Sequence, residues 1–102
     1  VLFRSDKTKF SKPAESYGEF DHRKNSITIH DDLSNLDYSC TLIHEVLHAI
    51  AYYYNLTQSG QPLDEENKEE VVINALSNGL VATLKENHIL LKILVEKLKN
   101  VR

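Results

Sequence analysis

A His-Glu-x-x-His pattern marks the residues of this chain whose types and spacing are best suited to chemistry. It lies in the apolar segment 41–50, whose sequence is TLIHEVLHAI. Side chains four residues apart share one face of a helix, so His44 and His48 can bind one metal ion through their imidazoles. Glu45 is one residue further round, where its carboxylate can reach a water molecule on that metal without binding the metal itself. The spacing therefore predicts a metal site that activates water.

A purely structural role is the competing interpretation of the same residues. Two histidines on a buried helix can be hydrogen-bonded core residues, with Glu45 paired to a surface lysine. Burial of such polar side chains is costly unless a partner satisfies them, and a metal ion with its water would do so. We favour the metal because apolar residues surround the motif on almost every side of the helix: Leu42, Ile43, Val46, Leu47, Ala49, Ile50 and Ala51.

A hydrolytic zinc site needs three protein ligands and one open position, so the chain must supply a further ligand. A third histidine six residues after His48 is absent, because that position is Tyr54. The better source is the acidic segment after the polar loop 57–62, which can return as an antiparallel helix. Its opening residues suit the helix dipole and solvent, and its later ones suit a ligand. The four candidates are Glu65, Glu66, Glu69 and Glu70.

Glu70 is the preferred third ligand. Asn74 falls one turn later on the same helix face, where it could orient a ligand by hydrogen bonding. Glu69 is the alternative, although the equivalent position one turn later is Ile73, which suits the core better.

Three other side chains are secondary candidates. Tyr52 lies one turn beyond His48 and could hydrogen-bond an oxyanion formed near the metal, as a catalytic residue. Tyrosines at such positions are more often half-buried core residues with a wet hydroxyl. His30 and His88 are further conceivable ligands, but His30 ends an expected strand, where a surface or capping role is usual.

Two alternating segments before the motif predict a β-hairpin. Residues 17–21 and 26–30 alternate apolar and polar side chains and flank the polar segment 22–25. Ile27 and Ile29 share one strand face and are expected to pack on the helices. Apolar residues at the start of the chain predict a further strand, followed by a mobile loop within residues 1–16. We therefore expect two or three antiparallel strands.

Two helices are expected to carry the site. Ser34 followed by Asp37 is a helix-start pattern, and the metal-binding helix is expected over residues 35–54. Asp64 is expected to cap a glutamate-bearing helix that continues to about Glu86.

A third helix is expected at the C-terminus. Residues 88–101 form an amphipathic segment that closes the core of the domain, or that forms an oligomer or partner surface if the core is already full. Gly79 in the preceding helix marks either a local weakness or a close approach to the metal-binding helix. The expected apolar stripe of the third helix contains Ile89, Leu90, Ile93, Leu94 and Leu98.

Length and composition indicate one small domain over residues 1–102, of which 41% are hydrophobic. A net charge of −3 without a basic cluster argues against nucleic acid and anionic membranes as partners. The lone Cys40 cannot form an internal disulfide, and no signal-peptide pattern or membrane-length apolar run is present, so a cytoplasmic location is expected. Because the chain begins with Val1 and lacks methionine, we expect the native N-terminus to lie upstream.

The region from about Tyr17 to Asn87 resembles the small zincins, in which a His-Glu-x-x-His helix precedes a helix with a glutamate ligand. The similarity lies in TLIHEVLHAI at 41–50 and in EEVVINAL at 69–76. It is a similarity to minimal gluzincins, including phage and mobile-element proteins related to the repressor-cleaving metallopeptidases.

This resemblance implies a zincin-like α+β fold, with Zn²⁺ as the cofactor and a peptide as the substrate. It implies His44 and His48 as ligands, Glu45 as general base and Glu70 as third ligand. It also implies that the strand Ile27-Thr28-Ile29 is an edge strand that binds the peptide.

The leading hypothesis is a zinc-dependent metallopeptidase-like domain acting on a peptide or protein. The alternative is a metal-stabilised binding module, catalytically weak or inactive, in which residues 88–101 dock a partner or form a homodimer. A third hypothesis is a metal-free α+β interaction domain.

Overall fold

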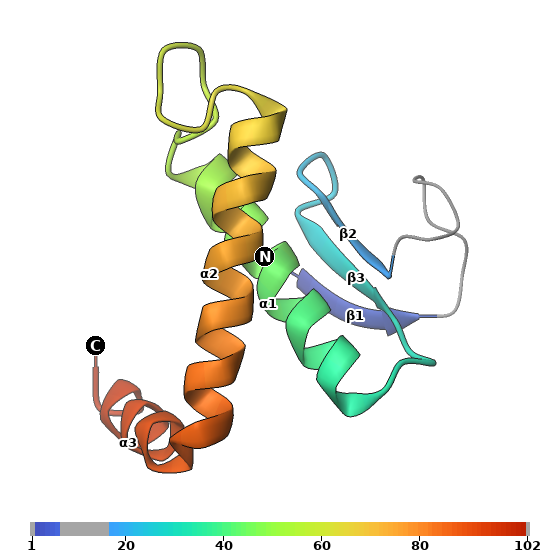
Figure 1. Ribbon diagram of the computed structural model, residues 1–102. Helices are drawn as coiled ribbons and strands as arrows, with labels where there is room; N and C mark the ends of the chain where they lie inside the picture. Colours follow the sequence, from blue (N-terminus) through green and yellow to red (C-terminus); the bar gives the residue numbers. More distant parts are fainter. Residues whose placement is uncertain (1, 7–16, 102) are drawn as a thin grey trace.

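The computed structural model describes residues 2–6 and 17–101, and side chains are described for residues 17–101. In this part of the chain a three-stranded sheet precedes three helices (Figure 1), which is the expected α+β class. The mobile loop expected before residue 17 lies outside the described residues. The elements in chain order are β1 (Leu2–Asp6), β2 (Gly18–Asp21), β3 (Ser26–His30), α1 (Asn35–Tyr53), α2 (Glu66–Glu86) and α3 (His88–Leu98).

β2 and β3 form the antiparallel hairpin that the alternating pattern predicts. The turn between them ends at Asn25, whose φ of 50° is a conformation that asparagine tolerates better than most residues. Asp21 stabilises the turn, because its carboxylate accepts a hydrogen bond from the backbone N–H of Arg23 at 2.9 Å. The hairpin prediction is therefore confirmed.

The first strand corrects two expectations about the sheet. β1 pairs with β3 in parallel, with Phe3 opposite Ile27, so the expectation that all strands are antiparallel is wrong for β1. The strand order β1-β3-β2 places β3 in the centre, so Ile27-Thr28-Ile29 is not an edge strand. The physical reason is that β2 and β1 occupy opposite hydrogen-bonding sides of β3. Among the described strands, β1 and β2 form the edges.

The main core lies between the sheet and α1. Ile27 and Ile29 are fully buried against Ala49, as the alternation of β3 predicts. Partly buried residues complete this cluster: Phe20, Leu33, Tyr38, Leu42 and Val46. Gly18 lies where β2 comes close to α1, because a Cβ atom there would be 2.8 Å from Thr41 Cγ2 and 2.9 Å from Ile29 Cδ1. β2 therefore packs closely against α1, the helix that carries the motif.

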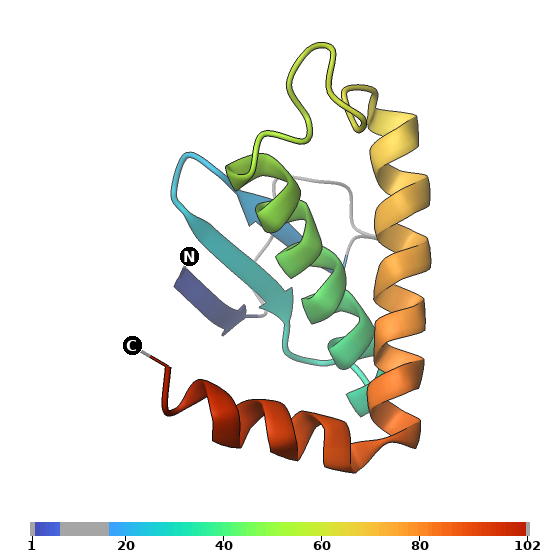
Figure 2. The ribbon, with the colours of Figure 1, turned by 90° about the vertical axis from the view of Figure 1, so that its left-hand side faces the viewer.

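α1 begins as the sequence indicates, since Ser34 Oγ accepts the backbone N–H of Asp37 at 3.1 Å. α2 returns antiparallel beside α1, so that α1 lies between the sheet and α2 (Figure 2). A second core cluster joins the two helices through Ala51 and Ile73, with Leu63 from the connecting loop. This pairing brings the glutamates of α2 towards the motif of α1.

Two details of α2 differ from the expectation. Its N-cap is Glu65, not Asp64, because the Asp64 carboxylate accepts the N–H of Gly60 in the preceding loop at 3.1 Å. Gly79 has no atom within 4 Å of the place a Cβ would occupy, so it marks no close approach to α1. Gly79 is an exposed glycine inside α2, which agrees with the expectation of a local weakness in that helix.

α3 follows α2 after Asn87 alone and turns away from the axis of α2 (Figure 2). It ends at Leu98, three residues before the expected end, and none of its residues is buried. Among the described elements it packs against α2 alone. The expectation that its apolar stripe closes the core is therefore wrong, because α1, α2 and the sheet already form that core. No helix in the described part of the chain is long and apolar enough to cross a membrane.

Candidate metal centre

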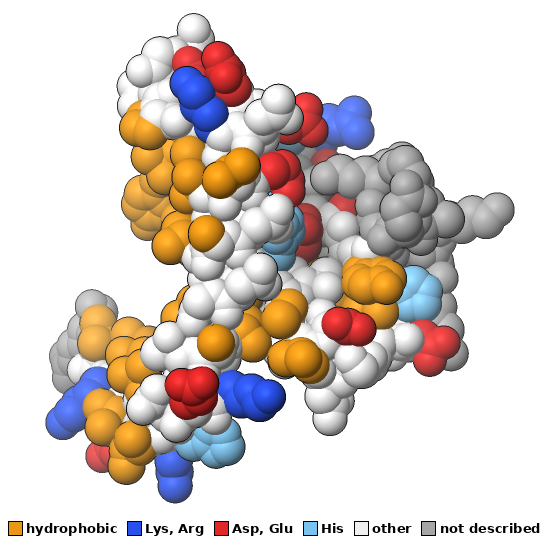
Figure 3. Space-filling model, viewed as in Figure 1, with side chains coloured by type: hydrophobic (Ala, Val, Ile, Leu, Met, Phe, Trp, Pro, Cys, Tyr) orange, Lys and Arg blue, Asp and Glu red, His pale blue; other side chains and the backbone are white. Residues whose placement is uncertain are grey.

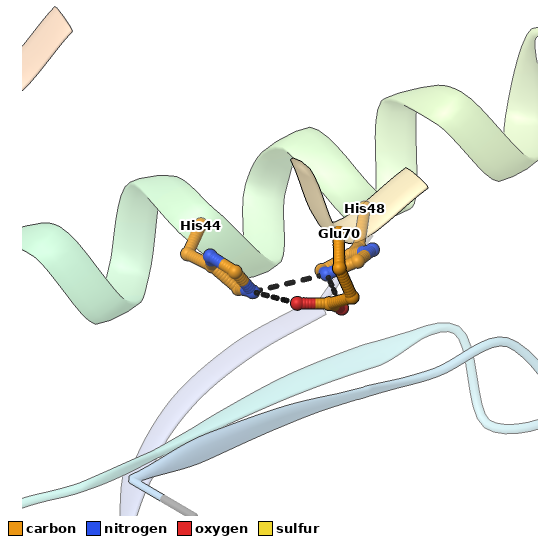
Figure 4. A group of neighbouring side chains, drawn as sticks. All are labelled: His44, His48 and Glu70. Carbon is orange, nitrogen blue, oxygen red and sulfur yellow. Dashed lines mark hydrogen bonds and ion pairs between the residues drawn. The ribbon is translucent and has the colours of Figure 1, made fainter. Parts of the chain in front are cut away.

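His44, His48 and Glu70 converge on one point between α1 and α2 (Figure 4), and their ligand atoms all lie within 4.8 Å of one another. His44 Nε2 and His48 Nε2 are 3.0 Å apart. The Glu70 carboxylate is 2.9 Å from His48 Nε2 and 3.7 Å from His44 Nε2. The helix spacing supplies both imidazoles, and the antiparallel return of α2 supplies the carboxylate. The group could hold a metal ion.

The separation of the two imidazole nitrogens is compatible with tetrahedral coordination. Metal–nitrogen and metal–oxygen bonds of about 2.0–2.1 Å at tetrahedral angles place neighbouring ligand atoms about 3.3 Å apart. The two Nε2 atoms are 3.0 Å apart, whereas the two Glu70 distances end at different oxygens, Oε1 at 2.9 Å from His48 and Oε2 at 3.7 Å from His44. Each histidine thus faces its own oxygen of the Glu70 carboxylate.

Glu69 contacts the same histidine from its other side. His48 Nδ1 and Glu69 Oε2 are 2.5 Å apart, and both side chains are largely buried. Glu69 does not belong to the group of three converging residues. A carboxylate on the far nitrogen of a histidine ligand fixes the tautomer and orientation of the ring. Glu69 can thus orient the ring of His48 for a metal. This role differs from that of the third ligand, which would bind the metal itself.

His48 lies between two carboxylates, Glu69 at Nδ1 and Glu70 at Nε2, which favours positive charge at its ring. When Nδ1 donates its proton to Glu69, Nε2 of a neutral His48 presents a lone pair. That lone pair lies 2.9 Å from an oxygen of Glu70, which is also an acceptor. Two acceptors at this distance repel each other unless a proton or a metal ion lies between them. The arrangement is therefore complementary to positive charge.

Glu45 is buried, with 5% of its surface exposed, although it is a charged residue on the helix of the motif. It lines the hollows on both sides of the converging residues. Charged residues are almost never this buried without a specific partner. The position of Glu45 suits a carboxylate that accepts and donates protons beside the three converging residues.

Two hollows lie beside the group, lined by residues of β2, α1 and α2, and we call them together the cleft. On one side lies a hollow of about 320 Å³, lined in part by Tyr17 and Gly18 of the β2 end and by Asn74 of α2. On the other side lies a hollow of about 260 Å³, lined in part by Phe20 and His22. Glu45, His48 and Glu70 line both hollows. An extended molecule lying in the cleft would therefore cross the metal group.

α2 presents one polar face to this cleft. Glu70, Asn74 and Ser77 recur at helical spacing and line the same hollow. Asn74 thus lies on the face of Glu70, as expected, while Ile73 is in the core. Ser77 is also buried, and its hydroxyl donates to the backbone carbonyl of Asn74. Sequence reasoning missed Ser77, although its spacing from Glu70 was a usable signal.

Tyr52 lies at the rim of the second hollow, together with His22. The two rings are stacked, with centroids 4.7 Å apart and planes 22° apart. The proposed contact of Tyr52 with an oxyanion stays a prediction. His22 was missed because the turn of the hairpin gave no sign that it would fold back over the motif helix. Tyr53, the residue after Tyr52, holds the hairpin turn against α1, since its hydroxyl donates a hydrogen bond to the Asn25 side chain in that turn.

The remaining candidates lie outside the group of three. His30 Nδ1 accepts the N–H of Asp32, which is the capping role expected of a histidine at a strand end. His88 begins α3 and lines a groove at the opposite end of α2. Glu65 and Glu66 belong to the cap and first turn of α2, although Glu66 also lines the second hollow.

Comparisons of this chain with protein-family models, with curated proteins and with solved structures find no match. The resemblance to small zincins therefore stays a prediction that rests on the motif.

Proposed function

We propose that this chain is a zinc-dependent metallopeptidase-like domain that hydrolyses peptide bonds with water. The observation that carries the proposal is the convergence of His44, His48 and Glu70 beside the buried carboxylate of Glu45. Two imidazoles and one carboxylate form a ligand set typical of hydrolytic zinc sites. A zinc ion bound there would supply Lewis-acid activation of water and of a substrate carbonyl.

Glu45 is the proposed general base. It cannot share the ligand positions of its neighbours, because it follows His44 directly and lies off the face shared by the two histidines. Its place in both hollows lets it accept a proton from water and donate it to a leaving amine. Glu69 supports this chemistry at a distance, because it holds the ring of His48 in one orientation.

β2 is the proposed docking strand for the peptide. It is an edge of the described sheet, and it forms one wall of the cleft. An extended peptide can add to such an edge through backbone hydrogen bonds, with side chains entering hollows on alternate sides. This replaces β3, which is central and has no free edge. Tyr52 and His22 line the second hollow, and we propose them as the groups that contact a developing negative charge.

The test is Glu45→Gln, which keeps the shape of the side chain but removes the base. We expect the variant to retain its metal and to lose at least about 100-fold in the hydrolysis of a mixed fluorogenic peptide library. Glu66→Gln is the matched control, because Glu66 lines the second hollow but is outside the metal group. Full activity in Glu45→Gln with full metal content would refute the proposal.

A metal-stabilised binding module is the second candidate. The observation that favours it is α3, which exposes its apolar residues and buries none. On this interpretation a metal at the same residues joins α1 to α2, while α3 serves an interaction. A chelator would then lower the unfolding temperature, since a ligand bound only to the folded state stabilises it, but no peptide in the library would be cleaved.

A further inference from the structure

α3 exposes seven apolar residues and buries none. Its apolar residues lie on several faces, and each is more than a third exposed. A broad exposed apolar face of a helix is normally covered by another surface. We call α3 the arm, and its exposed apolar residues are Ile89, Leu90, Leu91, Ile93, Leu94, Val95 and Leu98.

A groove with apolar walls lies at the base of the arm, and we call it the root groove. It has a volume of about 560 Å³. In Figure 3, apolar side chains gather over α3 at the lower left of the molecule. Apolar residues from three helices line the root groove: Leu36, Leu42 and Ile43 of α1, Val81 and Leu84 of α2, and Leu91 of α3.

The arm cannot fill the root groove of its own chain. His88 and Leu91 already form part of the wall, and only Asn87 separates the arm from α2. A face of the arm that contributes nothing to the groove contains Leu90, Leu94 and Leu98 at a spacing of four residues. One chain therefore carries both an uncovered apolar helix and an unfilled apolar groove.

Charge favours a second copy of this chain as the occupant. Residues 88–102 contain four basic residues and one acidic residue, which gives a net charge of +3. Residues 1–87 contain eight basic and fourteen acidic residues, which gives −6. The wall formed by α1 carries the exposed Asp37 at its start and follows the exposed Asp31 and Asp32. The root groove itself is lined by Lys85 and by no acidic residue. The attraction therefore acts between the whole C-terminal segment 88–102 of one copy and the acidic remainder of another.

We propose that two copies of this chain form a dimer by reciprocal docking, in which the arm of each copy lies in the root groove of the other. The free face with Leu90, Leu94 and Leu98 enters the groove, and Lys97, which borders that face, lies towards the acidic start of the partner's α1. Lys92 and Lys99 lie on the opposite side of the helix. Each dimer contains two identical arm–groove contacts related by a two-fold axis. The proposal is independent of the catalytic interpretation of the metal group.

The first experiment measures the mass of the wild-type chain in solution by light scattering and sedimentation at tens of micromolar. We expect twice the chain mass of 11.7 kDa. The arm variant Leu94→Gln with Leu98→Gln should give a monomer, as should the groove variant Leu36→Arg, which also repels a basic arm. Val71→Gln is the matched control, because Val71 is 70% exposed on α2 but does not line the root groove.

Mixing the two defective variants distinguishes arm–groove docking from arm–arm packing. The groove variant retains an intact arm, and the arm variant retains an intact groove, so the mixture should recover one contact and form a weaker heterodimer. Circular dichroism and metal content should match the wild type in both variants, since the arm buries no residue and Leu36 is exposed.

Three results would overturn the proposal. One is a monomeric wild type, which would leave the arm to a different partner. Another is a dimer that persists in Leu36→Arg, which would indicate arm–arm packing. The last is a mixture of the two variants that stays monomeric.

Discussion

The metal centre and the arm reverse the usual relation between residue type and burial. At the metal centre, α1 and α2 bury Glu45 and Ser77 and largely enclose His48. In the arm, leucines and isoleucines are exposed and nothing is buried. Burial of polar groups costs free energy unless they are satisfied, and exposure of apolar groups costs free energy unless they are covered. In the described residues every buried polar side-chain atom has a hydrogen-bond partner, so the polar groups of the metal centre are satisfied within the chain and could in addition hold a cation. The apolar residues of the arm are not covered within the described chain.

The metal centre and the arm also contribute differently to the stability of the folded monomer. The metal centre is built on a core that already holds α1 against both the sheet and α2. The arm adds no buried residue to that core. Changes near the centre should therefore alter the folded state of the monomer, whereas changes in the arm should alter association alone.

The largest contrast should come from truncating one apolar residue in each region. Ile73 is 2% exposed between α1 and α2, so Ile73→Ala should lower the free energy of unfolding by about 2–5 kcal/mol. Leu94 is 45% exposed, so Leu94→Ala should change it by less than about 0.5 kcal/mol in dilute solution, where the chain is monomeric. Urea denaturation measures both values. Equal losses would contradict the contrast.

The second expected effect concerns the hydrogen bond that orients His48. Glu69→Gln keeps the shape of the side chain but removes the charge that holds the imidazole proton. Metal affinity should fall by about 10–100-fold, as measured by competition with a chelating dye. Glu65→Gln is the control. Glu65 caps α2 one turn before Glu69, but its side chain is largely exposed and lies outside the metal group. An unchanged affinity in Glu69→Gln would remove Glu69 from the site.

Two glycines form a matched pair for the third effect. Gly18→Ala places a methyl group 2.8 Å from Thr41 Cγ2 and 3.1 Å from the carbonyl oxygen of Thr28. Because the backbone cannot yield easily there, we expect a loss of about 1–3 kcal/mol in stability by thermal or urea unfolding. A neutral result would mean that β2 does not lie as closely on α1 as the structure indicates.

Gly79→Ala should act in the opposite direction. The added methyl group meets no atom within 4 Å, and the residue is inside α2. Alanine restricts the unfolded chain and favours the helix, so stability should rise by about 0.4–1 kcal/mol in the same unfolding assay. Destabilisation would indicate a neighbour at this position.

The smallest effect should be a pH dependence of the hairpin turn. Partial desolvation raises the pKa of Asp21, but hydrogen bonds from the backbone of Arg23 and Lys24 and their positive charges lower it by more, to a value below the ordinary 3.8. A pKa lowered by folding stabilises the protein above the unfolded pKa, and that stability is lost as pH falls through the folded pKa. Asp21→Asn should therefore remove a small part of the acid sensitivity below about pH 4, followed by thermal unfolding between pH 3 and 6.

Local patterns in the sequence predicted much of this fold. Ser34 with Asp37, the alternation around Ile27 and the acidic start of α2 each depend on neighbouring residues, so their elements could be located. The parallel pairing of β1 was not predictable in this way, because it depends on which side of β3 the distant strand joins. The cap of α2 was misplaced by one residue because Asp64 bonds within the loop instead.

The candidate site was predictable to the extent that helix spacing determines it. The i, i+4 spacing brings His44 and His48 together, and Glu70, which the position of Asn74 favoured, joins them in a group that could hold a metal ion. The contact between Glu69 and His48 was not predictable, because it depends on the rotation of α2 about its own axis against α1. The position of His22 depends likewise on how the hairpin lies over the last turn of α1.

The central claim is that His44, His48 and Glu70 bind a metal ion, and elemental analysis of the purified chain tests it most directly. Wild type is compared with His48→Ala and Glu70→Gln, all checked for folding by circular dichroism. We expect about one zinc per wild-type chain, its loss in His48→Ala and a marked reduction in Glu70→Gln. Absence of metal from the wild type after refolding with zinc, or full metal content in folded His48→Ala, would contradict the account.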